Sequence, residues 1–240
     1  MDITNVIEAF DIRANHWMSI TNLSERPRHY HGAAYLGGYV YCVGGIAWLF
    51  IATNSVRRFD LSTRTWQEVA PMHYHRSYVS VTVLNGCIYI YICGGFDGNE
   101  ELQTAECYNP ETNQWTLISP MSRWRSGLGV IAYDNHVGGF DGINCLQTAE
   151  VYNPHTDTWR NVSSMMTARS NFGIEVVEDR LFVVGGLSDF STTISNVEYY
   201  DSETNEWSQA CDMHGGRGCL NCCVLSGLPN MAEYTIPRDL

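Results

Sequence analysis

The chain has 240 residues, of which 45% are hydrophobic and 12% aromatic, so it is long and apolar enough to bury the core of a single β-rich domain. Acidic side chains outnumber basic ones by 26 to 14, and the formal net charge of −12 excludes nucleic acid as an expected partner because it repels phosphates. No apolar run of membrane-spanning length and no signal-peptide pattern is present, so we expect a cytoplasmic protein without membrane contact.

The first strands in chain order are expected near residues 6–10 and 17–20. The second of them contains the first in a series of tryptophans that continues along the chain. We expect both strands to pair with a strand near residues 220–225. The two ends of the chain would then form one composite closing sheet from residues 1–23 and 217–228.

From residue 28 onward the chain repeats itself. Each copy contains a Gly-Gly pair and, 20 or 21 residues later, a tryptophan that has an aromatic residue seven positions before it and a methionine six positions after it. The pairs lie at residues 44–45, 94–95, 138–139 and 185–186, and the tryptophans are Trp66, Trp115, Trp159 and Trp207. The four copies span residues 28–72, 76–121, 125–165 and 169–213. A fixed period of this kind is typical of one supersecondary unit that stacks on its neighbours.

Each copy is expected to form four short strands. An arginine opens an apolar stretch, a second stretch ends at the Gly-Gly pair, a third ends at the aromatic residue, and a fourth begins at the tryptophan. The turn between the last two strands, as in residues 109–113 and 201–205, contains Asn and Asp, whose side chains bond their own backbone. Because so small a sheet is apolar on both faces, we expect the sheets to stack around an axis as propeller blades.

Copies two and three depart from the common length. The distance from the opening arginine to the Gly-Gly pair is longest in copy two and shortest in copy three, where residues 135–137 are all that precede the pair after the turn. We therefore expect copy three to lack most of its second strand. Since side chains alternate along a strand, an odd change of length also reverses which of them face inward.

The Gly-Gly pair with its spaced tyrosine and tryptophan resembles the kelch motif across residues 6–225. Segments 104–118 and 169–177 are similar to the kelch-like (BTB-BACK-kelch) family. The resemblance implies an all-β fold, a kelch-type β-propeller that forms a single domain over residues 1–240. The family's propeller usually has six blades, whereas four full repeats and one composite blade make about five, so we expect a propeller truncated from six.

The resemblance further implies a protein–protein interaction module, the substrate-recognition domain of a cullin-3 RING ubiquitin ligase adaptor, with no enzymatic activity of its own. In the family, BTB and BACK domains bind cullin-3, and these domains are absent from the 240 residues. The family holds its substrate protein on the loops before each first strand and after each Gly-Gly pair. By position, the corresponding residues are Arg28, Arg76, Ser77, Phe96, Arg125, Ser126, Phe140, Arg169, Ser170 and Leu187.

The arginines of this set recur once per copy and would converge around the mouth of the central channel. Their forked donors match carboxylates, so the expected partner is a substrate protein that presents an acidic or phosphorylated peptide. In the alternative, each arginine pairs with a carboxylate or a backbone carbonyl of its own blade and contributes to the fold.

No cofactor and no metal site is expected. Asp97-Gly98 and Asp141-Gly142 are typical of tight turns. A zinc site near the C-terminus would use Cys211, His214, Cys219, Cys222 and Cys223. These residues fall where the repeat predicts a strand, whose alternation turns Cys219 and Cys222 to opposite faces. Nine cysteines cannot all pair within the chain, and we expect buried reduced thiols.

Two other classes of function are alternatives. A cytoskeletal kelch scaffold that binds actin would favour basic outer surfaces, which a chain with 14 basic and 26 acidic residues does not provide. A propeller enzyme of the copper-oxidase type would need converging Tyr and His ligands. Neither that set nor a nucleophile elbow is evident in the sequence.

Overall fold

The computed structural model describes residues 8–11, 16–19, 28–47, 51–84, 90–132 and 135–224, and every regular element in these ranges is a β-strand. The all-β fold class is thereby confirmed. In the same ranges there is no helix with the length and apolar character needed to cross a membrane. Of the expected closing blade, residues 1–7, 12–15, 20–23 and 225–228 lie outside the described residues.

Four sheets of four antiparallel strands follow one another along the chain, and we call them blades 1 to 4. Blade 1 consists of β3 (Gly32–Leu36), β4 (Tyr39–Val43), β5 (Val56–Asp60) and β6 (Thr65–Val69), and blade 2 of β7 (Ser80–Val83), β8 (Ile90–Cys93), β9 (Ala105–Asn109) and β10 (Gln114–Ile118). Blade 3 consists of β11 (Gly129–Ile131), β12 (Asn135–Val137), β13 (Ala149–Asn153) and β14 (Thr158–Val162), and blade 4 of β15 (Gly173–Val177), β16 (Arg180–Val184), β17 (Val197–Asp201) and β18 (Glu206–Gln209). Each repeat therefore forms one blade.

The hairpin between the third and fourth strands shows how local chemistry forms a blade. In blade 4, the Asp201 Oδ1 atom accepts a hydrogen bond from the backbone N–H of Glu203 (2.9 Å). Asn205, at the end of the turn, has a left-handed φ of 57°, which asparagine tolerates better than most residues. The turn thereby sets the register in which Tyr200 lies opposite Trp207.

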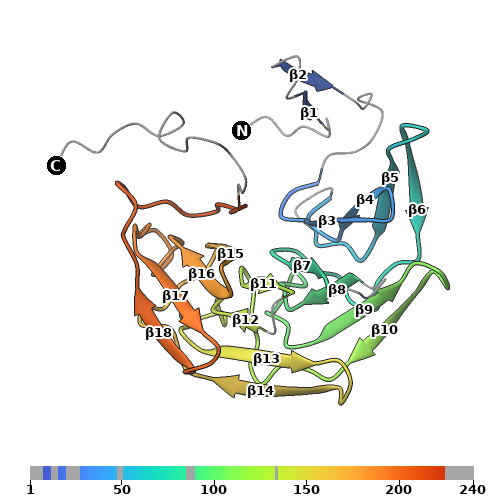
Figure 1. Cartoon of the computed structure of the whole chain (residues 1–240). Helices are drawn as coiled ribbons and strands as arrows, with labels where there is room; N and C mark the ends of the chain where they lie inside the picture. The colour runs from blue at the N-terminus through green and yellow to red at the C-terminus, as the bar shows by residue number, and fades with distance from the viewer. Residues whose placement is uncertain are drawn as a thin grey trace.

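The blades form an arc, with their first strands β3, β7, β11 and β15 toward its centre and in contact in that order (Figure 1). Apolar side chains fill the seams between blades, as where Tyr41 and Val43 of blade 1 pack with Ile92 and Trp115 of blade 2. The indole N–H of a tryptophan also donates to a backbone carbonyl of the preceding blade. These bonds are Trp115 to Ala70 (2.8 Å), Trp159 to Ser119 (2.6 Å) and Trp207 to Ser163 (2.8 Å). The expected radial stacking is confirmed.

Blade 3 is complete although its repeat is short. Strand β12 has three residues, yet it pairs with both β11 and β13. The residue before the Gly-Gly pair has the same partner in blades 3 and 4. Val137 lies opposite Gly129 in blade 3, and Val184 lies opposite Gly173 in blade 4. The missing residues shorten the hairpin end of β11 and β12. The expectation that copy three lacks most of its second strand is therefore wrong, and the pairing register is kept.

The two ends of the described chain do not form the expected composite sheet. Among the described strands, β1 (Glu8–Asp11) and β2 (His16–Ser19) pair only with each other. Residues 217–224 contain no strand, so the expected strand is wrong for the part that is described. This segment lies beside blade 4, where Cys219 N–H donates to Asn171 O (2.8 Å). Arg217 N–H also donates to Ile194 O (3.2 Å), and Arg217 O accepts from Gly186 N–H (2.7 Å). These isolated bonds are not the ladder of paired bonds that defines a strand.

Candidate functional site

Three of the predicted arginines are among the most buried side chains of the described structure. At most 1% of the surface of Arg76, Arg125 or Arg169 is exposed. In blade 2, Arg76 donates to the Gly94 carbonyl (2.7 Å) and to the Glu106 carboxylate (2.9 Å). Blades 3 and 4 contain the equivalent ion pairs Arg125–Glu150 (2.8 Å) and Arg169–Glu198 (2.5 Å). The arginine therefore joins the Gly-Gly pair to the third strand of its own blade.

Burial lowers the pKa of each of these arginines, and the adjacent glutamate opposes that change. Apart from the buried Arg169 Nε, the donors of their guanidinium groups are used inside the blades, and none of the three side chains is exposed. The expected ring of available guanidinium groups is therefore not found in the described structure. The alternative role, a pair with the arginine's own blade, is the one that the structure shows. Sequence reasoning missed the glutamates, although a signal exists two positions before the tyrosine of copies two to four, at Glu106, Glu150 and Glu198.

Arg28, the predicted counterpart in blade 1, has a different environment. It is half-buried and donates to the Ser55 carbonyl oxygen (2.8 Å) and to the Ser55 hydroxyl (2.8 Å). Its ion-pair partner is the exposed Glu68, at 4.0 Å. Arg28 therefore also contributes to its own blade.

The serines and apolar residues of the predicted set meet in pairs. Ser77 N–H donates to Phe96 O (2.9 Å), and Phe96 N–H donates to Ser77 O (2.8 Å), so the loop before the first strand lies beside the loop after the Gly-Gly pair. The same bridge joins Ser126 to Phe140 and Ser170 to Leu187. The second glycine of the pair permits this approach, because a Cβ on Gly95 would lie 2.8 Å from the Ser77 carbonyl oxygen.

A cavity of about 350 Å³ lies between these loops of blades 2, 3 and 4. Five of the predicted residues line it, namely Phe96, Ser126, Phe140, Ser170 and Leu187. Phe190, which sequence reasoning missed, also lines the cavity and is 79% exposed. Its ring meets the ring of Phe140 edge to face, with 5.1 Å between centroids. Its place in the loop after a Gly-Gly pair is the signal that could have identified Phe190.

The charged groups of this cavity are carboxylates. Glu101 and Asp189 line it, and its described lining includes no Lys, Arg or His. Burial raises the pKa of Glu101, and nearby carboxylates add to the increase. Backbone N–H groups of Ser191 and Thr192 donate to Asp189 and lower its pKa. The expected preference for an acidic or phosphorylated peptide therefore loses its structural basis.

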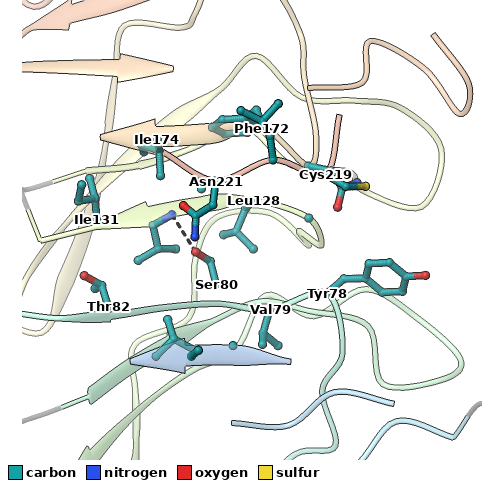
Figure 2. A pocket seen from close by; sticks show the side chains of 18 of the residues that line it. Tyr78, Val79, Ser80, Thr82, Leu128, Ile131, Phe172, Ile174, Cys219 and Asn221 are labelled. Atoms are coloured by element: carbon teal, nitrogen blue, oxygen red, sulfur yellow. Dashed lines mark hydrogen bonds between the residues drawn. The ribbon is translucent and has the colours of Figure 1, made fainter. Parts of the chain in front are cut away.

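A second cavity, of about 460 Å³, lies at the centre of the arc, where side chains of the innermost strands face one another (Figure 2). Here Val130 N–H donates to the Ser80 hydroxyl (3.0 Å) and joins blade 3 to blade 2. The residue two positions after each recurring arginine has a left-handed φ, and after the first of these residues each N–H donates to the carbonyl of the previous one: Tyr30, Tyr78, Gly127, Asn171 and Cys219. Tyr78 and Asn171 line both cavities, so this backbone ladder connects them.

The predicted Asp-Gly segments form turns. Asp97 Oδ1 accepts a hydrogen bond from Asn99 N–H (2.7 Å), and Asp141 Oδ1 accepts one from Asn144 N–H (2.8 Å). Among the cysteines of the C-terminal segment, Cys222 lies against Gly173 of β15. The described residues contain no group of three or more His, Cys, Asp or Glu side chains that is placed to hold a metal ion.

Known proteins place the blades in a family. The kelch motif matches residues 27–73, 75–122, 125–166 and 168–214, which together make up more than half of the chain. These four segments contain blades 1 to 4 in order. The match agrees with the Gly-Gly, tyrosine and tryptophan pattern of the repeats.

Longer proteins contain similar segments. Kelch repeat-containing protein kel-10 of Caenorhabditis elegans is 32% identical over 140 residues, 55% of this chain and 24% of the relative. Kelch-like protein 36 of Mus musculus is 24% identical over 95% of this chain and 31% of its own length. This chain thus spans only about a quarter to a third of these relatives. The solved structure of YjhT has the same fold, with a TM-score of 0.71, 14% identity, and coverage of 83% of this chain and 70% of that one. The chain belongs to the kelch-repeat family.

Proposed function

We propose that this chain is a protein–protein interaction domain whose loops on the Gly-Gly side hold a segment of a partner protein. The cavity of about 350 Å³ carries the proposal, because three consecutive blades contribute the same pair of loops to it. Loops on a rigid scaffold are the usual location of binding residues, since they vary without disturbing the blades. Concave sites with apolar walls and a few polar groups are typical binding sites.

The chemistry of the cavity supports binding rather than catalysis. Its thiol, that of Cys145, donates a hydrogen bond to the Ser170 hydroxyl (3.4 Å). Burial raises the pKa of Cys145, which keeps the thiol protonated and weakly nucleophilic. No histidine among the described lining residues is available to act as its base.

We further propose that the domain selects the substrate of a cullin-3 ubiquitin ligase. BTB and BACK domains outside these 240 residues would bind the cullin. The similarity to kelch-like proteins of greater length supports this arrangement. In it, the propeller would determine which protein is ubiquitinated and would take no part in the transfer itself.

Capture of partner proteins by the purified chain tests the binding proposal. The Phe140→Ala/Phe190→Ala variant removes two rings of the cavity, and Leu117→Ala removes an exposed apolar side chain from β10. We expect partners that bind the parent to bind Leu117→Ala equally and to be lost from the double variant, provided that all three proteins melt at the same temperature. Equal capture by all three would place binding elsewhere.

Cellular protein levels test the ligase proposal separately. The abundance of a captured partner should rise when cullin–RING ligases are inhibited. An unchanged abundance would contradict the ligase role and leave the binding proposal intact. Co-sedimentation with filamentous actin, lost in the same double variant, would instead support the cytoskeletal alternative.

A further inference from the structure

Four aromatic side chains line the cavity between blades 2, 3 and 4. They are Tyr78, Phe96, Phe140 and Phe190, and the Phe190 ring, from the loop after β16, meets the Phe140 ring edge to face. The Tyr78 ring stacks on Tyr30, with 4.0 Å between centroids, and burial raises the pKa of Tyr78 to about 12. The phenol is therefore uncharged at neutral pH. Rings that offer both faces and edges favour an aromatic guest over a polar one.

The loops around this cavity are acidic. The segments 96–101, 140–145 and 187–193 contain carboxylates and no Lys, Arg or His. Their acidic residues are Asp97, Glu100, Glu101, Asp141 and Asp189. Glu101, in the loop of blade 2, lies close to the loop of blade 3. A Cβ on Gly142 of that loop would stand 2.6 Å from the Glu101 carboxylate oxygen. Glu101 and Asp189 both line the cavity.

The arginines beneath these loops do not balance this negative charge, because each is already paired with a buried glutamate of its own blade. Arg123 lines a different cavity, together with Trp124 and Ile143. Asp141, Asp97 and Glu100 all act to raise the pKa of Glu101, after the larger effect of burial. A cation placed near Glu101 would relieve this repulsion.

We propose that the cavity binds a partner segment in which an aromatic side chain stands next to a lysine or arginine. This inference names the ligand class of the proposed binding function and rests on it. The aromatic ring would enter between Phe96, Phe140 and Phe190, and the cation would lie between Glu101 and Asp189. The buried ring would supply most of the affinity, and the charges at the rim would supply selectivity and faster association.

Selection from a random dodecapeptide library displayed on phage, with the purified 240-residue chain as bait, tests the ligand class directly. An enriched peptide is then titrated against two double variants of equal charge change. Glu101→Gln/Asp189→Asn alters the cavity, and asparagine at position 189 retains the oxygen that accepts the loop N–H groups. Asp201→Asn/Glu203→Gln alters the β17–β18 turn, where Asp201 has the same local role.

We expect enriched peptides to contain an aromatic residue beside Lys or Arg. Their affinity should fall about tenfold in the cavity variant and less than about twofold in the turn variant. Phe190→Ala, a change at an exposed loop tip, should also weaken binding about tenfold.

Other outcomes separate the two proposals. Acidic peptides that bind the parent and lose affinity in Phe140→Ala/Phe190→Ala would overturn the ligand class and leave the binding function standing. Enriched peptides that are insensitive to every cavity variant, or no enrichment at all, would contradict the binding function and the ligand class together.

Discussion

Blade 1 and blades 2 to 4 share a topology but are stabilised by different polar contacts. In blades 2 to 4, a fully buried arginine and glutamate pair inside the sheet. In blade 1, Arg57 stands where the others have the glutamate, and Arg28 lies 4.0 Å from Glu68, whose side chain is 68% exposed. An ion pair at the surface is screened by solvent and contributes little. Among the described residues, blade 1 therefore contains no fully buried Arg–Glu pair of the kind found in blades 2 to 4.

The seams differ in the same way. In blade 2, Tyr108 donates its hydroxyl to Asn113 Oδ1 (2.9 Å), and that oxygen also accepts a backbone N–H of blade 1 (2.9 Å). Blade 1 has Phe59 and Arg64 at these two positions. The buried indole N–H of Trp66 has no hydrogen-bond acceptor among the described residues. The hydroxyl, the side-chain acceptor and the tryptophan bond are thus all absent from the same described blade.

In blades 2 to 4, the tyrosine hydroxyl, its Asn or Asp acceptor and the tryptophan bond to the preceding blade therefore occur together. In blade 1 the guanidinium of Arg57 lies over the Trp66 ring, 4.6 Å from its centroid. This cation–π contact joins β5 to β6 within the blade.

Removal of a carboxylate from an Arg–Glu pair should show the difference between blade 3 and blade 1 most clearly. Glu150→Gln leaves Arg125 charged and uncompensated in the interior of blade 3, and we expect the free energy of unfolding to fall by about 3 to 5 kcal/mol. Glu68→Gln, at the surface pair of blade 1, should cost less than about 1 kcal/mol. Urea denaturation of both variants measures the difference. Equal losses would show that the two pairs have the same role.

Two glycines with the same backbone angle test the close approach between blades. Gly94 and Gly37 both have a φ of 59°, but a Cβ on Gly94 would clash with the Arg125 carbonyl oxygen, whereas nothing lies within 4 Å of one on Gly37. We expect Gly94→Ala to destabilise the protein by roughly 3 kcal/mol, and Gly37→Ala by about 1 kcal/mol, the cost of the φ angle alone. Melting temperatures of the two variants provide the comparison. Similar shifts would indicate that the φ angle, and not the clash, explains the Gly-Gly pair.

The tryptophan bond across the seam should have a smaller effect. Trp207→Phe loses the hydrogen bond to the Ser163 carbonyl in blade 3, whereas Trp66→Phe loses no such bond among the described residues. We expect Trp207→Phe to lower the free energy of unfolding by about 1 kcal/mol more than Trp66→Phe does. Denaturant titration of both variants measures this. A larger loss of stability in Trp66→Phe would contradict the absence of an acceptor for the Trp66 indole N–H among the described residues.

Acid should weaken one seam selectively. Asp157 accepts a hydrogen bond from Ser119 N–H and another from the Tyr152 hydroxyl, and these bonds lower its pKa. A lowered pKa adds stability that is fully present above the ordinary value of about 4 and is lost as pH falls through the folded-state value. Thermal melts from neutral pH to pH 3 should show a slightly smaller loss for Asp157→Asn than for the parent.

A reciprocal change provides the control for this pH effect. Asn113 has the equivalent position in the seam between blades 1 and 2 and does not titrate. Asn113→Asp should therefore introduce acid sensitivity there. Identical pH profiles for the parent and both variants would show that these seam positions do not contribute to acid unfolding.

Part of the candidate site was predictable from the resemblance to the kelch-like family. That resemblance implied Ser126 and Phe140 on one binding face, and the structure joins them by two backbone hydrogen bonds. The role of Arg125 was not predictable in the same way. Its partner Glu150 lies 25 residues further along the chain, and the two positions meet only through the pairing of β12 with β13.

The amino-acid sequence was sufficient to predict the repeat, the four-stranded blades and their hairpin turns, because these depend on backbone preferences and on side chains close together in the chain. It was not sufficient to predict which charged groups are buried. The fold buries Arg76, Arg125 and Arg169 against glutamates and leaves Glu101 and Asp189 at the cavity. Burial and charge pairing depend on contacts between residues far apart in the chain, so the face that was expected to be basic carries carboxylates.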